Sequence, residues 1–124
     1  MRRERRKYPR YVLKHDSFAA LGSDYSRAGR IIDISLGGLA FEYIVLDNSV
    51  GDNYSVEIFL SKGKLHLHRV PCRVVCDQEI FACASEFLET ENISTRVCRI
   101  EFEPMMMGQH EQLELVLDAY STVI

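Results

Sequence analysis

Short segments of the chain alternate apolar and polar side chains with a period of two, as in residues 39–43, 56–60 and 98–102. Successive side chains of a β-strand point to opposite faces, so this period gives each segment one buried face. Turn-forming residues separate such segments at 22–24, 47–48, 51–53 and 62–64. In a chain of 124 residues, this pattern predicts a mainly β domain, a small antiparallel barrel of six or seven strands.

In one longer segment, the apolar residues switch from odd-numbered to even-numbered positions. Leu65 and Leu67 share one face, but the next apolar residues fall on the opposite parity: Val70, Cys72, Val74 and Cys76. The change occurs at 69–71. A bulge or bend there would keep both apolar sets facing the core, and such irregularities help a small barrel to close.

The pattern becomes helical after Pro104. Apolar residues then recur at spacings of three and four, with acidic residues between them: Leu113, Val116, Leu117 and Tyr120. This spacing predicts a short amphipathic helix, packed over one opening of the barrel. We therefore expect residues 15–124 to form the barrel and its C-terminal helix.

Residues 1–14 are expected to form a flexible, extended arm, since Pro9 disfavours a helix for the residue before it. Residues 1–10 hold six basic residues and one acid, a net charge of +5, whereas the other 114 hold 9 basic and 17 acidic residues, a net charge of −8. A basic arm on an acidic body favours an anionic ligand held at the arm. A solubilising tail is the simpler alternative.

Two short motifs lie 23 residues apart. Arg6 and Arg10 form an R-x-x-x-R pattern in the arm, and Asp33, Ser35 and Gly38 form a D-x-S-x-x-G pattern on a strand-like stretch. Each has an ordinary explanation alone, because an arginine-rich arm matches the first by chance and a turn matches the second. Together they favour a receptor for a phosphate-bearing guanine ligand.

The chain resembles the PilZ domain, a bacterial family that binds the second messenger cyclic di-GMP. Both motifs of the family are intact and in the family's order. The segment 97–102 and the amphipathic stretch after it resemble the last strand and helix of the family. The resemblance implies a cyclic di-GMP receptor built on a PilZ-like barrel.

The resemblance assigns the arm arginines to the ligand. Arg6 and Arg10 would contact phosphate and guanine, with Arg5 as a third contact. A guanidinium fork can make paired hydrogen bonds to phosphate oxygens or to guanine O6 and N7, and its flat face can stack on a base. In the family, an arginine directly before R-x-x-x-R accompanies binding of a stacked ligand dimer, so Arg5 favours that stoichiometry.

The second motif would meet the ligand from the barrel. Asp33 can accept the N1–H and N2–H donors of guanine, and Ser35 can donate to a phosphate or base oxygen. Gly38 would let the backbone approach the ligand or take a positive φ, and Gly37 would add further freedom.

We expect such a receptor to signal by ordering its arm on ligand binding and presenting a new surface to a protein effector, as a monomer or weak dimer. A nucleic-acid-binding barrel is one alternative, but the acidic body offers no track for a phosphate backbone. A PilZ-like scaffold without ligand is another, against which the intact motifs count. The sequence does not indicate which pathway lies downstream.

The remaining polar candidates favour structural roles. His66 and His68 share a strand face and could ligate a metal, but an exposed strand face is the simpler interpretation. Four cysteines lie in apolar strand-like segments and are expected to be free, buried thiols rather than zinc ligands: Cys72, Cys76, Cys83 and Cys98. We therefore expect no metal and no cofactor beyond the ligand.

The sequence contains no arrangement typical of an enzyme: no nucleophile with a matching base, no paired catalytic carboxylates and no phosphate-binding G-x-x-x-x-G-K-[ST]. It has no apolar N-terminal leader, and no run approaches the roughly 20 apolar residues of a membrane span. These observations predict a cytoplasmic binding protein that is not an enzyme and does not insert into membranes.

Overall fold

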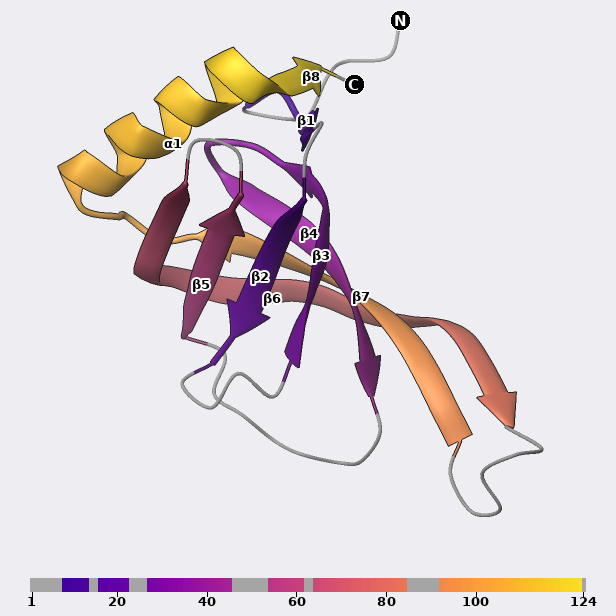
Figure 1. The fold of residues 1–124 in the computed structure, drawn as a ribbon. Coiled ribbons are helices and arrows are strands. Elements are labelled where there is room, and N and C mark those ends of the chain that lie inside the picture. Colours follow the sequence, from indigo (N-terminus) through magenta and orange to yellow (C-terminus); the bar gives the residue numbers. More distant parts are fainter. Residues whose placement is uncertain are drawn as a thin grey trace, which may run out of the picture.

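The computed structural model describes residues 8–13, 16–22, 27–45, 54–61, 64–84 and 92–123. These ranges form eight strands and one helix (Figure 1): β1 (Tyr11–Leu13), β2 (Ser17–Leu21), β3 (Arg27–Ile34), β4 (Gly38–Val45), β5 (Ser55–Leu60), β6 (Leu65–Ala84), β7 (Asn92–Phe102), α1 (Met107–Tyr120) and β8 (Ser121–Val123).

Six of the strands close into a barrel. They follow the order β2-β5-β6-β7-β4-β3, and a further pairing of β2 with β3 joins the two ends. Each pairing of neighbours in this ring is antiparallel. The predicted small antiparallel barrel is therefore confirmed, and closure leaves no free edge in this ring.

The segment just after the arm is already part of the sheet. Tyr11 of β1 pairs with Ile34 of β3, and β1 also pairs with β8 along Tyr11–Leu13. The expectation of an arm extending through residue 14 is wrong for residues 11–13, because their backbone is in these two ladders. Residues 1–7, with Arg5 and Arg6, lie outside the described residues.

Alternation along the strands builds the core as the sequence predicts. The inward residues of three strands are buried: Leu39, Phe41 and Tyr43 of β4, Val56, Ile58 and Leu60 of β5, and Cys98 and Ile100 of β7. Burial of such side chains contributes about 1.5–3 kcal/mol each.

Strand β6 bends where its parity changes. Val56 pairs with Val70, but Ile58 pairs with Leu67, so two residues of β6 oppose the single Glu57 of β5. The bulge includes Arg69, whose φ of 50° is unusual for a residue with a side chain. The predicted bend at 69–71 is thus confirmed, with Leu67 and Val70 both buried. Beyond the barrel, β6 and β7 continue as a long hairpin (Figure 1).

Helix α1 lies across one end of the barrel (Figure 1). Leu113, Val116 and Leu117 are buried in the same apolar cluster as the barrel core, which confirms the predicted amphipathic helix. No helix in the described part of the chain is long and apolar enough to cross a membrane.

The cysteines follow the prediction in part. Cys72 and Cys98 are buried thiols, and burial raises the pKa of the Cys98 thiol to about 12, so it stays protonated. Cys76 is only half-buried, because the strand register shifts between Val74 and Cys76. The side chain of Cys83 lies outside the described residues.

Candidate ligand-binding pocket

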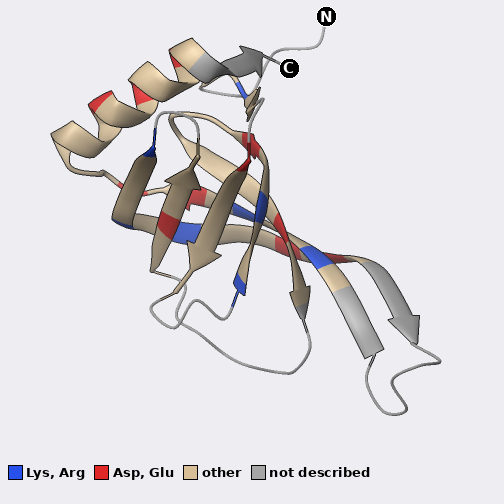
Figure 2. Cartoon of the chain, viewed as in Figure 1, with Lys and Arg blue, Asp and Glu red and all other residues tan. Residues whose placement is uncertain are grey.

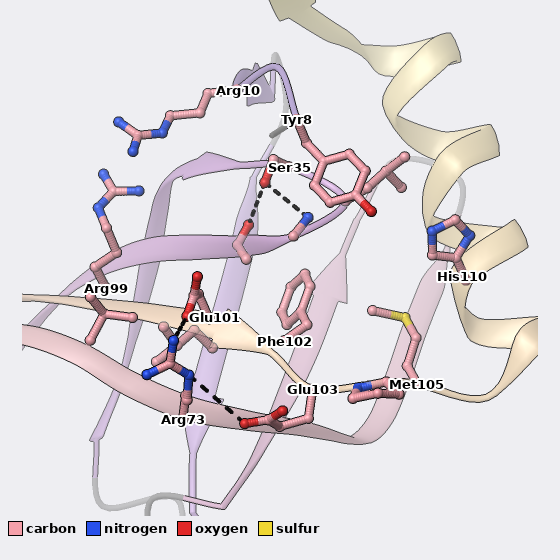
Figure 3. Close-up of a pocket in the computed structure, with 16 residues that line it drawn as sticks. Tyr8, Arg10, Ser35, Arg73, Arg99, Glu101, Phe102, Glu103, Met105 and His110 are labelled. Atoms are coloured by element: carbon pink, nitrogen blue, oxygen red, sulfur yellow. Dashed lines mark hydrogen bonds and ion pairs between the residues drawn. The ribbon is translucent and has the colours of Figure 1, made fainter. Parts of the chain in front are cut away.

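A cavity of about 720 Å³ lies where the N-terminal segment meets the turn after β3, strands β6 and β7, and the start of α1 (Figure 3). Polar side chains from all these elements line it, together with the backbone of the turn: Tyr8, Arg10, Ser35, Gly37, Gly38, Arg73, Arg99, Glu101, Glu103 and His110. The two motifs of the sequence thus contribute to one cavity, although they lie apart in the chain.

The turn between β3 and β4 is held by its own serine. The Gly37 amide donates to the hydroxyl oxygen of Ser35 at 3.0 Å, and the Ser35 amide donates to the carbonyl of Gly38 at 2.8 Å. The Ser35 hydroxyl also lies 3.4 Å from that carbonyl. Ser35 therefore shapes the turn in the way expected of an ordinary serine turn.

Gly37 brings the two motifs into contact. A Cβ at this position would lie 2.8 Å from the Cδ2 atom of Tyr8, so the missing side chain makes room for the tyrosine ring. Tyr8 lies between Arg6 and Arg10 in the first motif. Its packing on the turn places Arg10 at the rim of the cavity (Figure 3).

Gly38 is required by a close approach of backbone. A Cβ here would lie 2.2 Å from the carbonyl oxygen of Ile100 in β7, too close for any side chain. Among the described glycines, only Gly22 has a positive φ. The close approach at Gly38 is to β7, so the expected approach to the ligand stays a prediction, and the alternative of a positive φ is wrong.

Asp33 lies behind the cavity wall and holds an arginine. Its two carboxylate oxygens accept hydrogen bonds from Arg99 at 3.1 and 3.0 Å, and the residue is only 8% exposed. Asp33, Ala40 and Arg99 are aligned across β3, β4 and β7. Because the Ala40 side chain is small, the Asp33–Arg99 ion pair can cross over β4. The pair has two parallel N–H···O bonds, and such paired bonds are among the strongest ion-pair geometries.

Positive charge gathers at one side of the cavity. Figure 3 shows the guanidinium groups of Arg10 and Arg99 turned toward each other. Arg73, on the opposite wall, pairs with Glu101 and lies 3.9 Å from Glu103. Asp33 offsets the charge of Arg99, but two guanidinium groups that face each other still offer N–H donors to an anion between them.

The structure thus places four of the seven predicted site residues on the cavity: Arg10, Ser35, Gly37 and Gly38. Asp33 reaches the cavity through Arg99, and Arg5 and Arg6 lie outside the described residues. Sequence reasoning missed Arg99 and Arg73. A signal was present for Arg99, because it alternates with the buried Cys98 and Ile100 and so faces outward on β7.

The chain is thus a small closed β-barrel, capped by a helix and with a cavity rimmed by arginines. The chain belongs to the PilZ domain family, whose profile matches residues 4–119. No curated protein matches the sequence significantly.

Two solved structures share the fold. The PilZ domain with c-di-GMP of YcgR from Escherichia coli superposes with a TM-score of 0.67 at 18% identity, over 94% of this chain and 92% of that chain. YcgR in complex with c-di-GMP, also from Escherichia coli, gives a TM-score of 0.63 at 17% identity, over 94% of this chain and 46% of that chain.

Proposed function

We propose that this protein is a receptor for cyclic di-GMP rather than an enzyme. The observation that carries the proposal is the meeting of the two motifs: Tyr8 packs on Gly37, and Arg10 shares a cavity with Ser35 and Gly38. Membership of the PilZ family and the fold shared with ligand-bound YcgR support it.

In this proposal the phosphates lie between the facing guanidinium groups. Arg10 supplies a forked donor, and Arg99 beside it adds the N–H groups that do not bond Asp33, which suits a phosphodiester or the O6 and N7 edge of guanine. Arg6 and Arg5 add donors from the same arm, and Arg5 favours a stacked ligand dimer.

The D-x-S-x-x-G motif shapes the cavity and orients Arg99. Asp33 fixes the guanidinium of Arg99 and still has lone pairs that could accept guanine N–H donors, because an ionised carboxylate offers about four acceptor sites. Ser35 holds the turn and presents its hydroxyl to the cavity, while Gly37 and Gly38 let the arm, turn and β7 come close.

Signalling follows from the position of the arm. Ligand bridges residues 1–10 to the barrel, orders them and presents a new surface to a protein effector. Because β1 is already paired with β3 and β8, the change is confined to the residues before it. A ligand shifts such an equilibrium only by its different affinity for the two arm states.

The charge pattern of the described residues favours a compact anion over a nucleic acid. Figure 2 shows basic and acidic positions mixed over the barrel, and the described charged residues of α1 other than histidine are acids: Glu111, Glu114 and Asp118. A phosphate backbone needs a continuous basic track, which this part of the chain does not offer.

Calorimetry with nucleotides tests the function. We expect saturable binding of cyclic di-GMP and much weaker binding of cyclic di-AMP, GTP and GMP, because the site combines guanine-matched groups with donors for two phosphates. The same titration gives the stoichiometry. Equal affinity for cyclic di-AMP would contradict guanine recognition, and no binding of cyclic di-GMP would refute the function.

Hydrogen exchange tests the arm. Residues 1–10 should exchange more slowly once cyclic di-GMP is bound, whereas amides near Ile58 and Ile100 should change little, since the barrel is complete without ligand. Ordering each backbone residue costs about 1–2 kcal/mol, which the new charge-assisted bonds must offset. Protection of the arm that does not depend on ligand would leave binding intact but rule out this switch.

A further inference from the structure

A second cluster of ligating side chains lies on the β5–β6 hairpin. Glu57 comes from β5, and His66 and His68 come from β6. The bulge in β6 places His68 and Arg69 opposite Glu57. None of these residues lines the cavity described above.

The carboxylate of Glu57 is buried, at 3% exposure of the residue, and faces both imidazoles. His66 Nε2 lies 3.0 Å from Glu57 Oε1, and His68 Nδ1 contacts the same oxygen. The backbone amide of Arg69 donates to the other oxygen, Oε2, at 2.5 Å. Within the described residues, Glu57 forms its ion pairs with these two histidines and with no lysine or arginine.

We propose that Glu57, His66 and His68 form a binding site for a divalent transition-metal ion, and that this ion is zinc. Their three ligand atoms lie within 4.8 Å of one another. Two imidazole nitrogens and one carboxylate oxygen are a donor set that zinc accepts, with metal–ligand distances of about 2.0–2.2 Å and a fourth position open to solvent.

The surrounding structure positions this donor set. The Arg69 amide, which lies in the β6 bulge, orients the carboxylate. The His66 ring stacks on Phe59, with ring centroids 4.4 Å apart. The side chain of Gln109 in α1 donates to the carbonyl of His68 at 2.7 Å, so the backbone that carries His68 is also held.

A metal ion can reach the cluster from solvent, and the histidines can free their coordinating nitrogens of protons. The side chains of His66 and His68 are 47% and 59% exposed, so an ion can enter over their outer edges. Each coordinating nitrogen must present its lone pair. Any proton on it therefore moves to the other ring nitrogen or leaves to solvent when the metal binds.

This site was not apparent in the sequence, where His66 and His68 were expected to form an exposed strand face without metal. The third ligand comes from a different strand, and the β6 bulge sets its position. No fixed spacing along the chain records that arrangement. The inference is independent of the proposed cyclic di-GMP function, since it uses other residues.

Zinc titration of the full chain tests the proposal. After treatment with a chelator, wild-type protein should bind one zinc ion per chain in competition with a chromophoric chelator. His66→Ala and His68→Ala should each weaken this binding by about 100-fold or more, since the loss of supporting groups alone costs about 10- to 100-fold. Each variant leaves Glu57 its other imidazole and the Arg69 amide, so we expect the fold to be retained, which circular dichroism would check.

His110→Ala is the matched control, because it removes a histidine outside the cluster and should leave zinc affinity unchanged. Cobalt(II) provides a second measurement, since its visible absorption reports nitrogen and oxygen ligands and should disappear in His68→Ala. Absence of saturable zinc binding by the wild-type chain would overturn the proposal. So would binding that persists in His66→Ala and His68→Ala, because it would assign the ion to other residues.

Discussion

Replacing Arg10 with alanine should weaken cyclic di-GMP binding by about 1.5–3 kcal/mol, the scale of a charge-assisted hydrogen bond, which raises Kd by about 10- to 150-fold. The reason is geometric. Arg10 lines the cavity and its guanidinium is turned toward that of Arg99 (Figure 3), so its loss removes one of the two groups that would hold an anion. Arg6→Ala should have a similar effect if the first motif acts as a unit. Calorimetry measures both.

Two further variants show whether binding depends on the charge of Arg10, on its planar fork, or only on the net charge of the protein. Arg10→Lys keeps the charge but loses the planar fork, so we expect an affinity between those of wild type and Arg10→Ala. Arg30→Ala removes an exposed arginine that pairs with Glu42 at 3.2 Å, away from the cavity, and should bind ligand as wild type does. Equal losses in Arg30→Ala and Arg10→Ala would show that net charge, rather than the site, controls binding.

The fold was largely predictable because its determinants are local. The alternation at Leu39, Phe41 and Tyr43 reflects the geometry of a single strand, and the parity change at Arg69 reflects a single bulge. Strand β1 was missed for the opposite reason. Its pairing of Tyr11 with Ile34 depends on a partner more than twenty residues away, and the charges next to it favoured an arm.

The candidate site was predictable only where a motif records it. Arg10 and Gly38 belong to motifs with fixed spacing, so the sequence identified them. The position of Arg99 depends on the register of β3, β4 and β7, which aligns it with Asp33 across Ala40. The grouping of Glu57 with His68 likewise depends on how two strands pair around a bulge. Sequence spacing contains neither relation.

The ion pair of Asp33 and Arg99 should make a large contribution to both stability and binding, and a double-mutant cycle can separate the two. Arg99→Ala leaves the Asp33 side chain, which is 10% exposed, without its partner, which costs about 1–3 kcal/mol or more of unfolding free energy. Asp33→Ala should cost less, because the Arg99 side chain is 33% exposed and water can solvate it. The double variant should be more stable than Arg99→Ala alone. Urea unfolding followed by circular dichroism measures this, since the chain has no tryptophan.

The same cycle decides how Asp33 serves the ligand. Both of its oxygens are bonded to Arg99, so we expect Asp33 to act mainly by orienting that guanidinium. Asp33→Ala should then weaken cyclic di-GMP binding in the wild-type background but change it little once Arg99 is alanine. Asp33→Asn retains an acceptor oxygen without the charge, so it should recover part of the loss. If Asp33→Ala costs as much with Arg99 absent as with it present, Asp33 contacts guanine directly, as the sequence motif predicted.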